Sequence, residues 1–519
     1  MTRLGSAKPD TGIRLRPLPH RPDATEVGRT EDPRPAVEAS GVPWKLLLVL
    51  FAGSLAIRVA FALVSDNEDG DAFARIVYSR MVAQQGILVP TEDWLPGHFW
   101  LLALPRAVGL GNQMSLRLVT AVTGALAVPC TYLIGDMFFG RRAALVTALI
   151  LAFNPLHIRF STITVSESFF ILLVAIVLLS FLRHLAQGGT RHLIIGAAAL
   201  DLAASLRAEA WLLAGVLPAV AMLSLRRPEF PEAKTLLRRA LAFAMAGSVF
   251  TGGWLVFSWI EYGDPLHLLT LASQRIAMDT SYQQVSTWHT LIFWPVVLCV
   301  SLGPIFFIAA LLGTASNLKR SGPRFLALMF TTFTLIYYVQ NFRSGLITDA
   351  RYGLFLTWLL ALNMGAVVQL EPRFSRSSTA AVAVAWLLLV WAIAEAPFGV
   401  LSQKFGSITP RPRFESDVRR VDSWLRTHAT DGPVVLGPGL RRYGPWLSEL
   451  DEWRSPDDVH VVTSPDWPTA SERLAAAGHV VADKAVANLP PGDSDLREAL
   501  TVGPYVVYRW GNEQDARSK

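Results

Sequence analysis

The chain has 519 residues, of which 52% are apolar and only 17% are charged, and its mean hydropathy is +0.36. Soluble domains carry about 25% charged residues, so this composition excludes a soluble enzyme, a disordered chain and a disulfide-rich scaffold. It predicts a protein with several helices that cross a membrane. The net charge of +6 does not by itself indicate a nucleic-acid partner, because membrane proteins collect Lys and Arg on their cytoplasmic face.

The N-terminal segment, residues 1–42, is rich in charged residues and proline and has no apolar periodicity. This pattern predicts a disordered cytoplasmic tail. No sustained apolar run begins before Leu46 and no small-residue cleavage site follows it, so we expect no signal peptide.

Apolar segments that approach the thickness of a bilayer recur from residue 44 onward. We predict eleven membrane spans, plus or minus one, and hence an α-helical polytopic membrane protein. The spans lie near residues 44–65, 115–137, 143–160, 168–182, 193–206, 209–225, 240–260, 290–313, 325–341, 352–370 and 379–397.

The basic residues of the loops predict the orientation in the membrane. With a cytoplasmic N-terminus, every inner loop carries at least two Lys or Arg residues, and the short outer loops carry far fewer. The inner loops hold, in chain order, Arg141 and Arg142; Arg183 and Arg191; Arg226, Arg227, Lys234, Arg238 and Arg239; Lys319, Arg320 and Arg324; and Arg373 and Arg376. The positive-inside rule therefore places the N-terminus in the cytoplasm. An odd number of spans places the C-terminal segment outside, in a multi-pass protein of the plasma membrane.

Two segments are too long to be simple connections. Residues 66–114 form an acidic first outer loop, in which helical spacing over 72–84 predicts an amphipathic helix on the membrane surface and 98–109 predicts a second short helix. Residues 401–519 have the composition of a soluble domain. The chain therefore divides into a tail (1–42), a transmembrane domain (43–400) and an extracytoplasmic domain (401–519).

The C-terminal segment alternates helix and strand patterns. A helix is predicted over 417–429 and another near 470–477, with strands at 433–436, 459–463, 480–482 and 505–508. This order predicts a small α/β domain, which we interpret as a cap that shapes the access of the acceptor.

Ionisable residues gather at the predicted outer ends of the spans. A charge near hydrocarbon is costly unless it is paired or functional. Taken alone, each such residue is explained as an anchor at the membrane–water interface. Anchors placed by chance, however, would be distributed over both faces of the membrane. They are Asp71, His157, Arg159, Glu167, Arg207, Glu209, Asp349 and Arg351.

This mixture of residue types suits one chemistry. Arginines bind phosphate through paired hydrogen bonds, and a carboxylate can take the proton of an attacking hydroxyl. The combination fits a phosphate-linked substrate whose lipid part stays in the membrane.

Several motifs resemble those of GT-C glycosyltransferases, in the branch of the dolichyl-phosphate-mannose protein mannosyltransferases and aminoarabinose transferases. In the first outer loop, an Asp opens the motif and an Arg closes it nine positions later, as Asp71 and Arg80 do here. The other matching stretches are 94–99, Arg117 with 139–142, 154–161 with Glu167, 206–210, and 349–352. Together they cover roughly residues 44–400.

The resemblance implies an inverting transferase that uses a monosaccharide linked to polyprenyl phosphate. It implies that Asp71 is the catalytic base, that Arg207 and Arg351 hold the departing phosphate, and that Glu167 and His157 orient the acceptor or the sugar. The implied substrate-binding set is completed by Arg80, Glu209, Asp349 and Tyr352. The implied partners are the lipid-linked donor, membrane lipids and an acceptor protein, lipid or polysaccharide, with no nucleic acid and no cofactor.

The sequence departs from the family pattern in two places. Ala72 stands where the family often has a second acid, and no lysine is present at Trp94 or Leu95, where aminoarabinose transferases carry one. Asp69 and Asp71 also form a D-x-D pattern, which holds a divalent metal in other glycosyltransferases. Acids in a loop are usually only solvated, so we predict no metal.

Two other classes of function remain as alternatives. A transporter or flippase of a lipid-linked sugar would show repeated halves and charges at mid-membrane, whereas no repeat is found and the charges gather at one edge. A scaffold or polymer-export subunit would tolerate the replacement of Asp71 by Asn.

Overall fold

The computed structural model describes most of the chain between residues 43 and 510. The described ranges are 43–65, 70–92, 94–225, 230–278, 287–344, 350–370, 417–429, 432–437, 458–461, 478–483 and 496–510, with the single residues 440, 446, 450 and 454. The predicted tail, the predicted span 379–397 and the predicted helix near 470–477 lie outside these ranges, as do Asp69 and Asp349.

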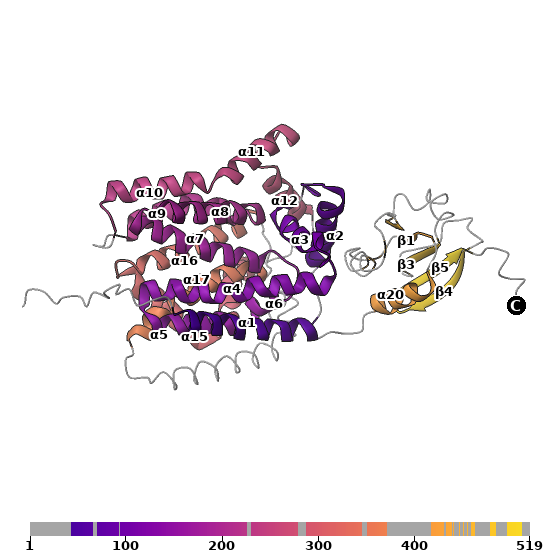
Figure 1. Ribbon diagram of the computed structural model, residues 1–519, viewed down its shortest axis with the longest axis horizontal. Helices are drawn as coiled ribbons and strands as arrows, with labels where there is room; N and C mark the ends of the chain where they lie inside the picture. Colours follow the sequence, from indigo (N-terminus) through magenta and orange to yellow (C-terminus); the bar gives the residue numbers. More distant parts are fainter. Residues whose placement is uncertain are drawn as a thin grey trace, which may run out of the picture. The chain divides into compact units, whose positions relative to one another are not determined.

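The first half of the chain forms a bundle of apolar helices that pack side by side (Figure 1). These helices are α1 (Trp44–Val64), α4 (Gln113–Phe139), α5 (Arg141–Phe153), α7 (Glu167–Gln187), α8 (Thr190–Leu206) and α9 (Glu209–Ser224). Within the described ranges, five helices of the chain are long and apolar enough to cross a membrane, or up to seven if each of two bent helix pairs counts as one span. A helical multi-pass membrane protein is therefore confirmed, whereas the predicted number of eleven spans is not.

Three predicted spans are broken in the structure. The span predicted at 143–160 is wrong as a single helix, because α5 ends at Phe153 and the short helix α6 (Pro155–Phe160) follows. Asn154 causes the break: its side chain caps α6 by accepting the N–H of His157, and Pro155 occupies the first turn, where its missing N–H costs nothing.

The spans predicted at 240–260 and 290–313 also each contain two helices. Helices α10 (Ala233–Ala246) and α11 (Val249–Tyr262) meet at 45°, and α14 (Thr287–Leu302) and α15 (Pro304–Leu318) meet at 112°. The sharper turn lies at Gly303, whose φ of +79° favours glycine, and Pro304 then starts α15.

The last described helices of the bundle are α16 (Arg324–Ser344), the 3₁₀ turn η1 (Ala350–Tyr352), α17 (Gly353–Asn363) and α18 (Gly365–Leu370). Helix α15 approaches α17 closely, because Gly313 has no side chain: a Cβ atom there would lie 2.3 Å from the carbonyl oxygen of Asn363. This close contact fixes the position of α17, and the turn η1 directly precedes α17 in the chain.

The segment predicted as the first outer loop contains both helices that were expected there, α2 (Gly70–Gln85) and α3 (Gly97–Ala107). They pack against each other and bury Ala72, Ile76, Phe99 and Leu102. Helix α3 also contacts α8, at Gly97, where a Cβ atom would overlap the side chain of Ser205. A further helix, α12 (His267–Met278), follows α11.

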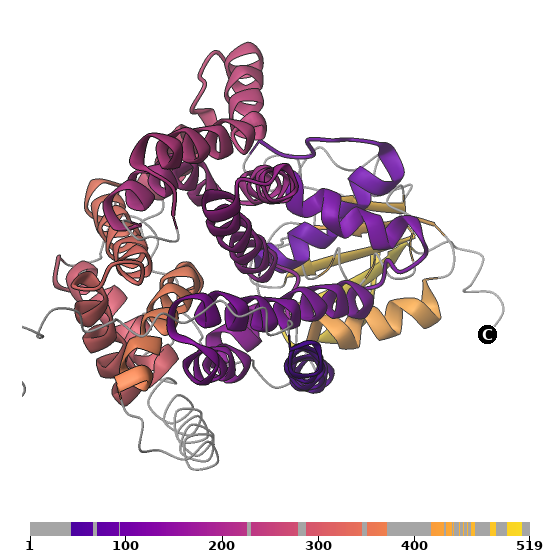
Figure 2. The same ribbon diagram turned by 60° about the vertical axis from the view of Figure 1, so that its left-hand side comes forward.

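The C-terminal segment contains a five-stranded sheet in the order β2-β1-β3-β5-β4. Strands β2 (Val459–Val461), β1 (Val434–Leu436) and β3 (His479–Asp483) are parallel to one another. Strand β5 (Tyr505–Trp510) pairs antiparallel with β3 on one side and with β4 (Leu496–Val502) on the other. Helix α20 (Asp417–His428) lies along the sheet (Figure 2). The combination of helix and sheet is as expected, except that β4 was not predicted, since its sequence LREALTV carries few strand-forming residues.

Candidate active site

An ion pair joins the two most distant motifs of the chain. Asp71, the second residue of α2, accepts a hydrogen bond from Nη1 of Arg351, which lies in η1, 280 positions later. A carboxylate in the first turn of a helix is favoured by the helix dipole. The side chains of Asp71 and Arg351 remain 29% and 17% exposed, so the pair is accessible to a substrate.

A second cluster forms where α7 and α9 begin and α8 ends. Arg207, between α8 and α9, donates from Nη1 to Glu167 Oε1 at 2.6 Å and from Nη2 and Nε to Glu209 Oε1 at 2.6 and 3.2 Å. The hydroxyl of Tyr337 on α16 also donates to Glu209 Oε1, at 3.3 Å. Burial alone would lower the pKa of Arg207, but the charges of Glu209 and Glu167 outweigh burial and raise it, so the guanidinium stays protonated.

Tyr352 connects the two clusters. The centre of its ring lies 5.1 Å from the guanidinium carbon of Arg207 and 5.0 Å from that of Arg351, and its hydroxyl accepts a hydrogen bond from Arg351 Nη2 at 3.1 Å. The electron-rich ring is attracted to both cations and keeps their like charges apart.

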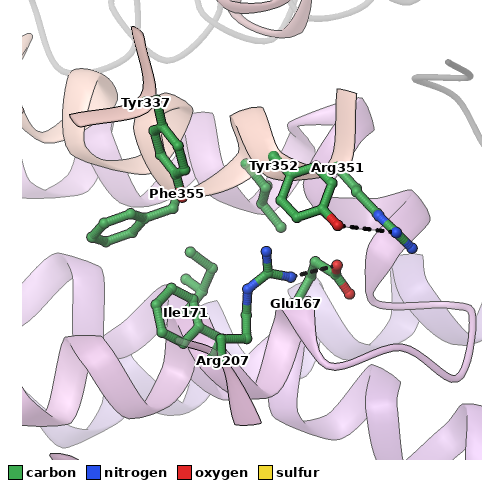
Figure 3. Close-up of a pocket in the computed structure, with 9 residues that line it drawn as sticks. Glu167, Ile171, Arg207, Tyr337, Arg351, Tyr352 and Phe355 are labelled. Atoms are coloured by element: carbon green, nitrogen blue, oxygen red, sulfur yellow. Dashed lines mark hydrogen bonds and ion pairs between the residues drawn. The ribbon is translucent and has the colours of Figure 1, made fainter. Parts of the chain in front are cut away.

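A small pocket, partly open to solvent, lies between these groups (Figure 3). It is lined by Glu167, Phe170, Ile171, Arg207, Tyr337, Arg351, Tyr352, Leu354 and Phe355. The polar residues come from α7, the connection between α8 and α9, α16 and η1, so the pocket exists only in the assembled bundle. It places carboxylates, guanidinium groups and aromatic rings around one small space.

Of the residues predicted for the site, six meet here: Asp71, Glu167, Arg207, Glu209, Arg351 and Tyr352. His157 instead lies fully buried on α6, where its Nδ1 is 2.6 Å from Nη2 of Arg58 on α1. Arg80 donates to Gln84 one turn further along α2. In the described part of the chain, no group of three or more His, Cys, Asp or Glu side chains that could hold a metal is found.

Three residues near the site were missed by the sequence interpretation. Arg58 lies inside the predicted span 44–65 and Tyr337 inside the predicted span 325–341, so neither was singled out. Arg75 lies one helical turn after Asp71, so the i, i+4 spacing was the available signal.

Arg75 is only 7% exposed. Its guanidinium carbon lies 5.1 Å from the ring centre of Trp94 and 5.8 Å from that of Phe99. Its Nε and Nη1 atoms have no hydrogen-bond partner among the residues that the structure describes. Burial lowers the pKa of Arg75, and the charges of Glu167 and Asp71 oppose this effect.

Known proteins with a similar sequence or structure identify the fold that carries this site. The profile of the dolichyl-phosphate-mannose-protein mannosyltransferase family matches residues 90–250. The crystal structure of ArnT from Cupriavidus metallidurans bound to undecaprenyl phosphate is similar with a TM-score of 0.62 and 12% identity, over 90% of this chain and 98% of that chain. The chain has the GT-C fold. The resemblance to GT-C proteins of the protein mannosyltransferase branch, predicted from the motifs, is therefore confirmed.

Other GT-C structures are also similar. The apo form of the same ArnT has a TM-score of 0.62 and 14% identity, with the same coverage. The oligosaccharyltransferase of Archaeoglobus fulgidus, in complex with Zn and sulfate, has a TM-score of 0.47 and 13% identity, over 90% of this chain and 73% of that one. No curated protein sequence matches the chain.

Proposed function

We propose that the protein is a membrane glycosyltransferase, which transfers a monosaccharide from polyprenyl phosphate to an acceptor hydroxyl on the extracytoplasmic face, with inversion. The observation that carries the proposal is the ion pair of Asp71 with Arg351 beside the pocket. The GT-C fold supports it, because an ArnT of this fold was solved with undecaprenyl phosphate bound.

In the proposed reaction, Asp71 accepts the proton of the acceptor hydroxyl. The acceptor oxygen bonds to the anomeric carbon from the side opposite the phosphate, and the bond from that carbon to the phosphate oxygen breaks. The electron pair of this bond leaves with polyprenyl phosphate, whose negative charge grows in the transition state. Arg351, which contacts Asp71 directly, stabilises that charge by moving from the carboxylate toward the phosphate.

We assign a different part to Arg207 from the one that the family resemblance implies. Each of its three nitrogens donates to a carboxylate, Nη1 to Glu167 and the other two to Glu209. Its charge is therefore already neutralised, and it holds the two carboxylates in place beside the pocket. Arg351 is the guanidinium that we assign to the phosphate.

We further propose the predicted orientation, with a cytoplasmic N-terminus and residues 401–519 outside as a separate domain. It is supported by contacts between segments that were expected on the inner face: the N–H of Gly322 donates to the carbonyl of Ser224 at 3.2 Å, and Arg320 donates to Gln369 at 3.0 Å. The site residues gather instead at the helix ends that were expected outside.

A transfer assay tests the function. Purified protein is given polyprenyl-phosphate-linked sugars and candidate acceptors, and the wild type is compared with Asp71→Asn. We expect the variant to lose a factor of about 10²–10⁴ in rate, because Asn cannot accept the proton. Glu261→Gln, which changes an exposed acid to its amide at the end of α11, should keep the rate.

Equal product from the wild type and Asp71→Asn would contradict the assignment. The transporter alternative has its own signature: a wild type that moves the lipid-linked sugar across vesicle membranes without forming any glycosylated acceptor.

A further inference from the structure

Two buried charged residues, Glu167 in the lining of the pocket and Arg75 one turn after Asp71, have atoms without a hydrogen-bond partner among the described residues. Arg75 is 7% exposed and has two nitrogens, Nε and Nη1, without a hydrogen bond. Glu167 is 4% exposed, and its Oε2 atom also has none among the described residues. An unsatisfied buried donor or acceptor costs free energy, so both groups indicate that a ligand completes their hydrogen bonds.

Thr164, three residues before Glu167, donates to the carbonyl oxygen of Ala72 at 2.9 Å, so the starts of α7 and α2 lie next to each other, yet Arg75 and Glu167 do not pair. Glu167 is the carboxylate whose charge acts most strongly on Arg75, followed by Asp71. Even so, no ion pair of Arg75 is found in the described ranges.

Each group instead contacts other residues. Arg75 packs on the rings of Trp94 and Phe99. Glu167 is bound through Oε1 to Arg207 (Figure 3), while its second oxygen has no hydrogen-bond partner in the described part of the chain. Each group is therefore fixed by other residues, and neither satisfies the unpaired atoms of the other.

The opposite charges of the two groups restrict what can bind there. A phosphate or carboxylate would accept from Arg75 but would meet the negative charge of Glu167. An ammonium would donate to Glu167 but would meet the positive charge of Arg75. A hydroxyl accepts from one and donates to the other, so it satisfies both.

We propose that Arg75 and Glu167 form the subsite that binds a hydroxyl of the donor sugar, and that the donor carries a neutral, polyhydroxylated monosaccharide. Amino sugars and uronic acids are disfavoured at this position. The inference rests on the proposed function, since Glu167 lines the same pocket as Arg351, the residue assigned to the phosphate. A sugar attached to that phosphate lies next to it.

Binding to the full-length protein in lipid nanodiscs tests the subsite without requiring transfer. The probes are undecaprenyl phosphate alone and undecaprenyl phosphate that carries mannose, glucose, galactose, 4-amino-4-deoxyarabinose or glucuronic acid. We expect at least one neutral sugar to bind more tightly than both charged ones, by about tenfold, as for a lost hydrogen bond to a charged group. Tighter binding of a charged sugar than of all three neutral sugars would overturn the proposal.

The variant Arg75→Met separates recognition of the sugar from recognition of the phosphate. We expect it to weaken binding of the preferred sugar lipid by about tenfold and to leave binding of sugar-free undecaprenyl phosphate within about twofold. An equal loss for both lipids would show that Arg75 binds the phosphate instead. Arg191→Met, at the exposed start of α8 and far along that helix from the site, controls for the loss of a positive charge.

If Arg75→Met does not fold, Arg75→Lys replaces it: lysine keeps the charge but not the planar group that reaches the hydroxyl, so the selective loss should persist. The two proposals fail differently. A wild type that shows the Arg75-dependent preference without any transfer contradicts only the enzymatic function. Transfer with no change in the preference on Arg75→Met contradicts only the subsite.

Discussion

Arg207 pairs with two carboxylates through one guanidinium, in a place that is almost closed to water. The side chains of Arg207, Glu167 and Glu209 are 10%, 5% and 15% exposed. In such surroundings, removing one partner lowers the stability by more than the intact pair contributes to it, because the other charge is left buried and unpaired.

We therefore expect Arg207→Met to destabilise the protein strongly, by about 3 kcal/mol, since it leaves two carboxylates without a cation. Glu209→Gln should cost less, because Glu167 still balances Arg207. The double variant Arg207→Met with Glu209→Gln should recover part of the loss. Melting temperatures in detergent measure these effects, and a double variant less stable than Arg207→Met would contradict the explanation.

At the level of single residues, the sequence predicts charged groups well and their partners poorly. Asp71, Glu167, Arg207 and Arg351 could be singled out because a charge next to hydrocarbon needs a reason. The same reasoning assigned His157 to the site, yet it contacts Arg58, a residue hidden within an apolar span. Partners that are hundreds of positions apart depend on how the helices pack, which local patterns do not encode.

Among the elements, the contact of α15 with α17 depends on a single missing side chain. At Gly313 a Cβ atom would lie 2.3 Å from a backbone oxygen of Asn363, and backbone cannot move aside as a flexible side chain can. Helix α17 continues from η1, so this contact also supports the position of Arg351.

Gly313→Ala should lower stability by about 1–3 kcal/mol, as overpacking does in other cores, and should reduce transfer by displacing η1. Gly253→Ala on α11 is the matched control, since a Cβ atom there meets nothing within 4 Å. In that open position alanine should keep or slightly raise the melting temperature, because it favours helix more than glycine does. Equal melting temperatures for the two variants would show that α15 and α17 tolerate a wider spacing.

The positions of most helices could be predicted, but the breaks within them could not. Apolar composition alone reveals a span, and α1, α4, α7, α8 and α9 lie close to the predicted ranges. Within an apolar run, however, the pairs Asn154–Pro155 and Gly303–Pro304 permit either a kink or a complete turn. Packing decides between these outcomes, and at Gly303 it produces a turn of 112°.

On the scale of the whole molecule, the proposed topology makes a simple prediction. In a variant whose two cysteines, Cys130 and Cys299, are replaced by serine, a membrane-impermeant maleimide added to intact cells should label Ser423→Cys in α20. It should not label Lys319→Cys, whose position lies at an expected inner loop. Both positions are exposed, so accessibility to the reagent depends on the side of the membrane. Labelling of Lys319→Cys alone would reverse the orientation and the proposed side of the reaction.

The 280 positions between Asp71 and Arg351 also affect how the protein is made. A ribosome that has inserted the first helices has produced the carboxylate but not the guanidinium that holds it. Arg351 emerges only after α16, when most of the bundle is already in the membrane. A chain interrupted during synthesis therefore lacks half of the pair. In the proposed reaction, truncated products then cannot consume lipid-linked sugar, and activity begins only when the bundle is nearly complete.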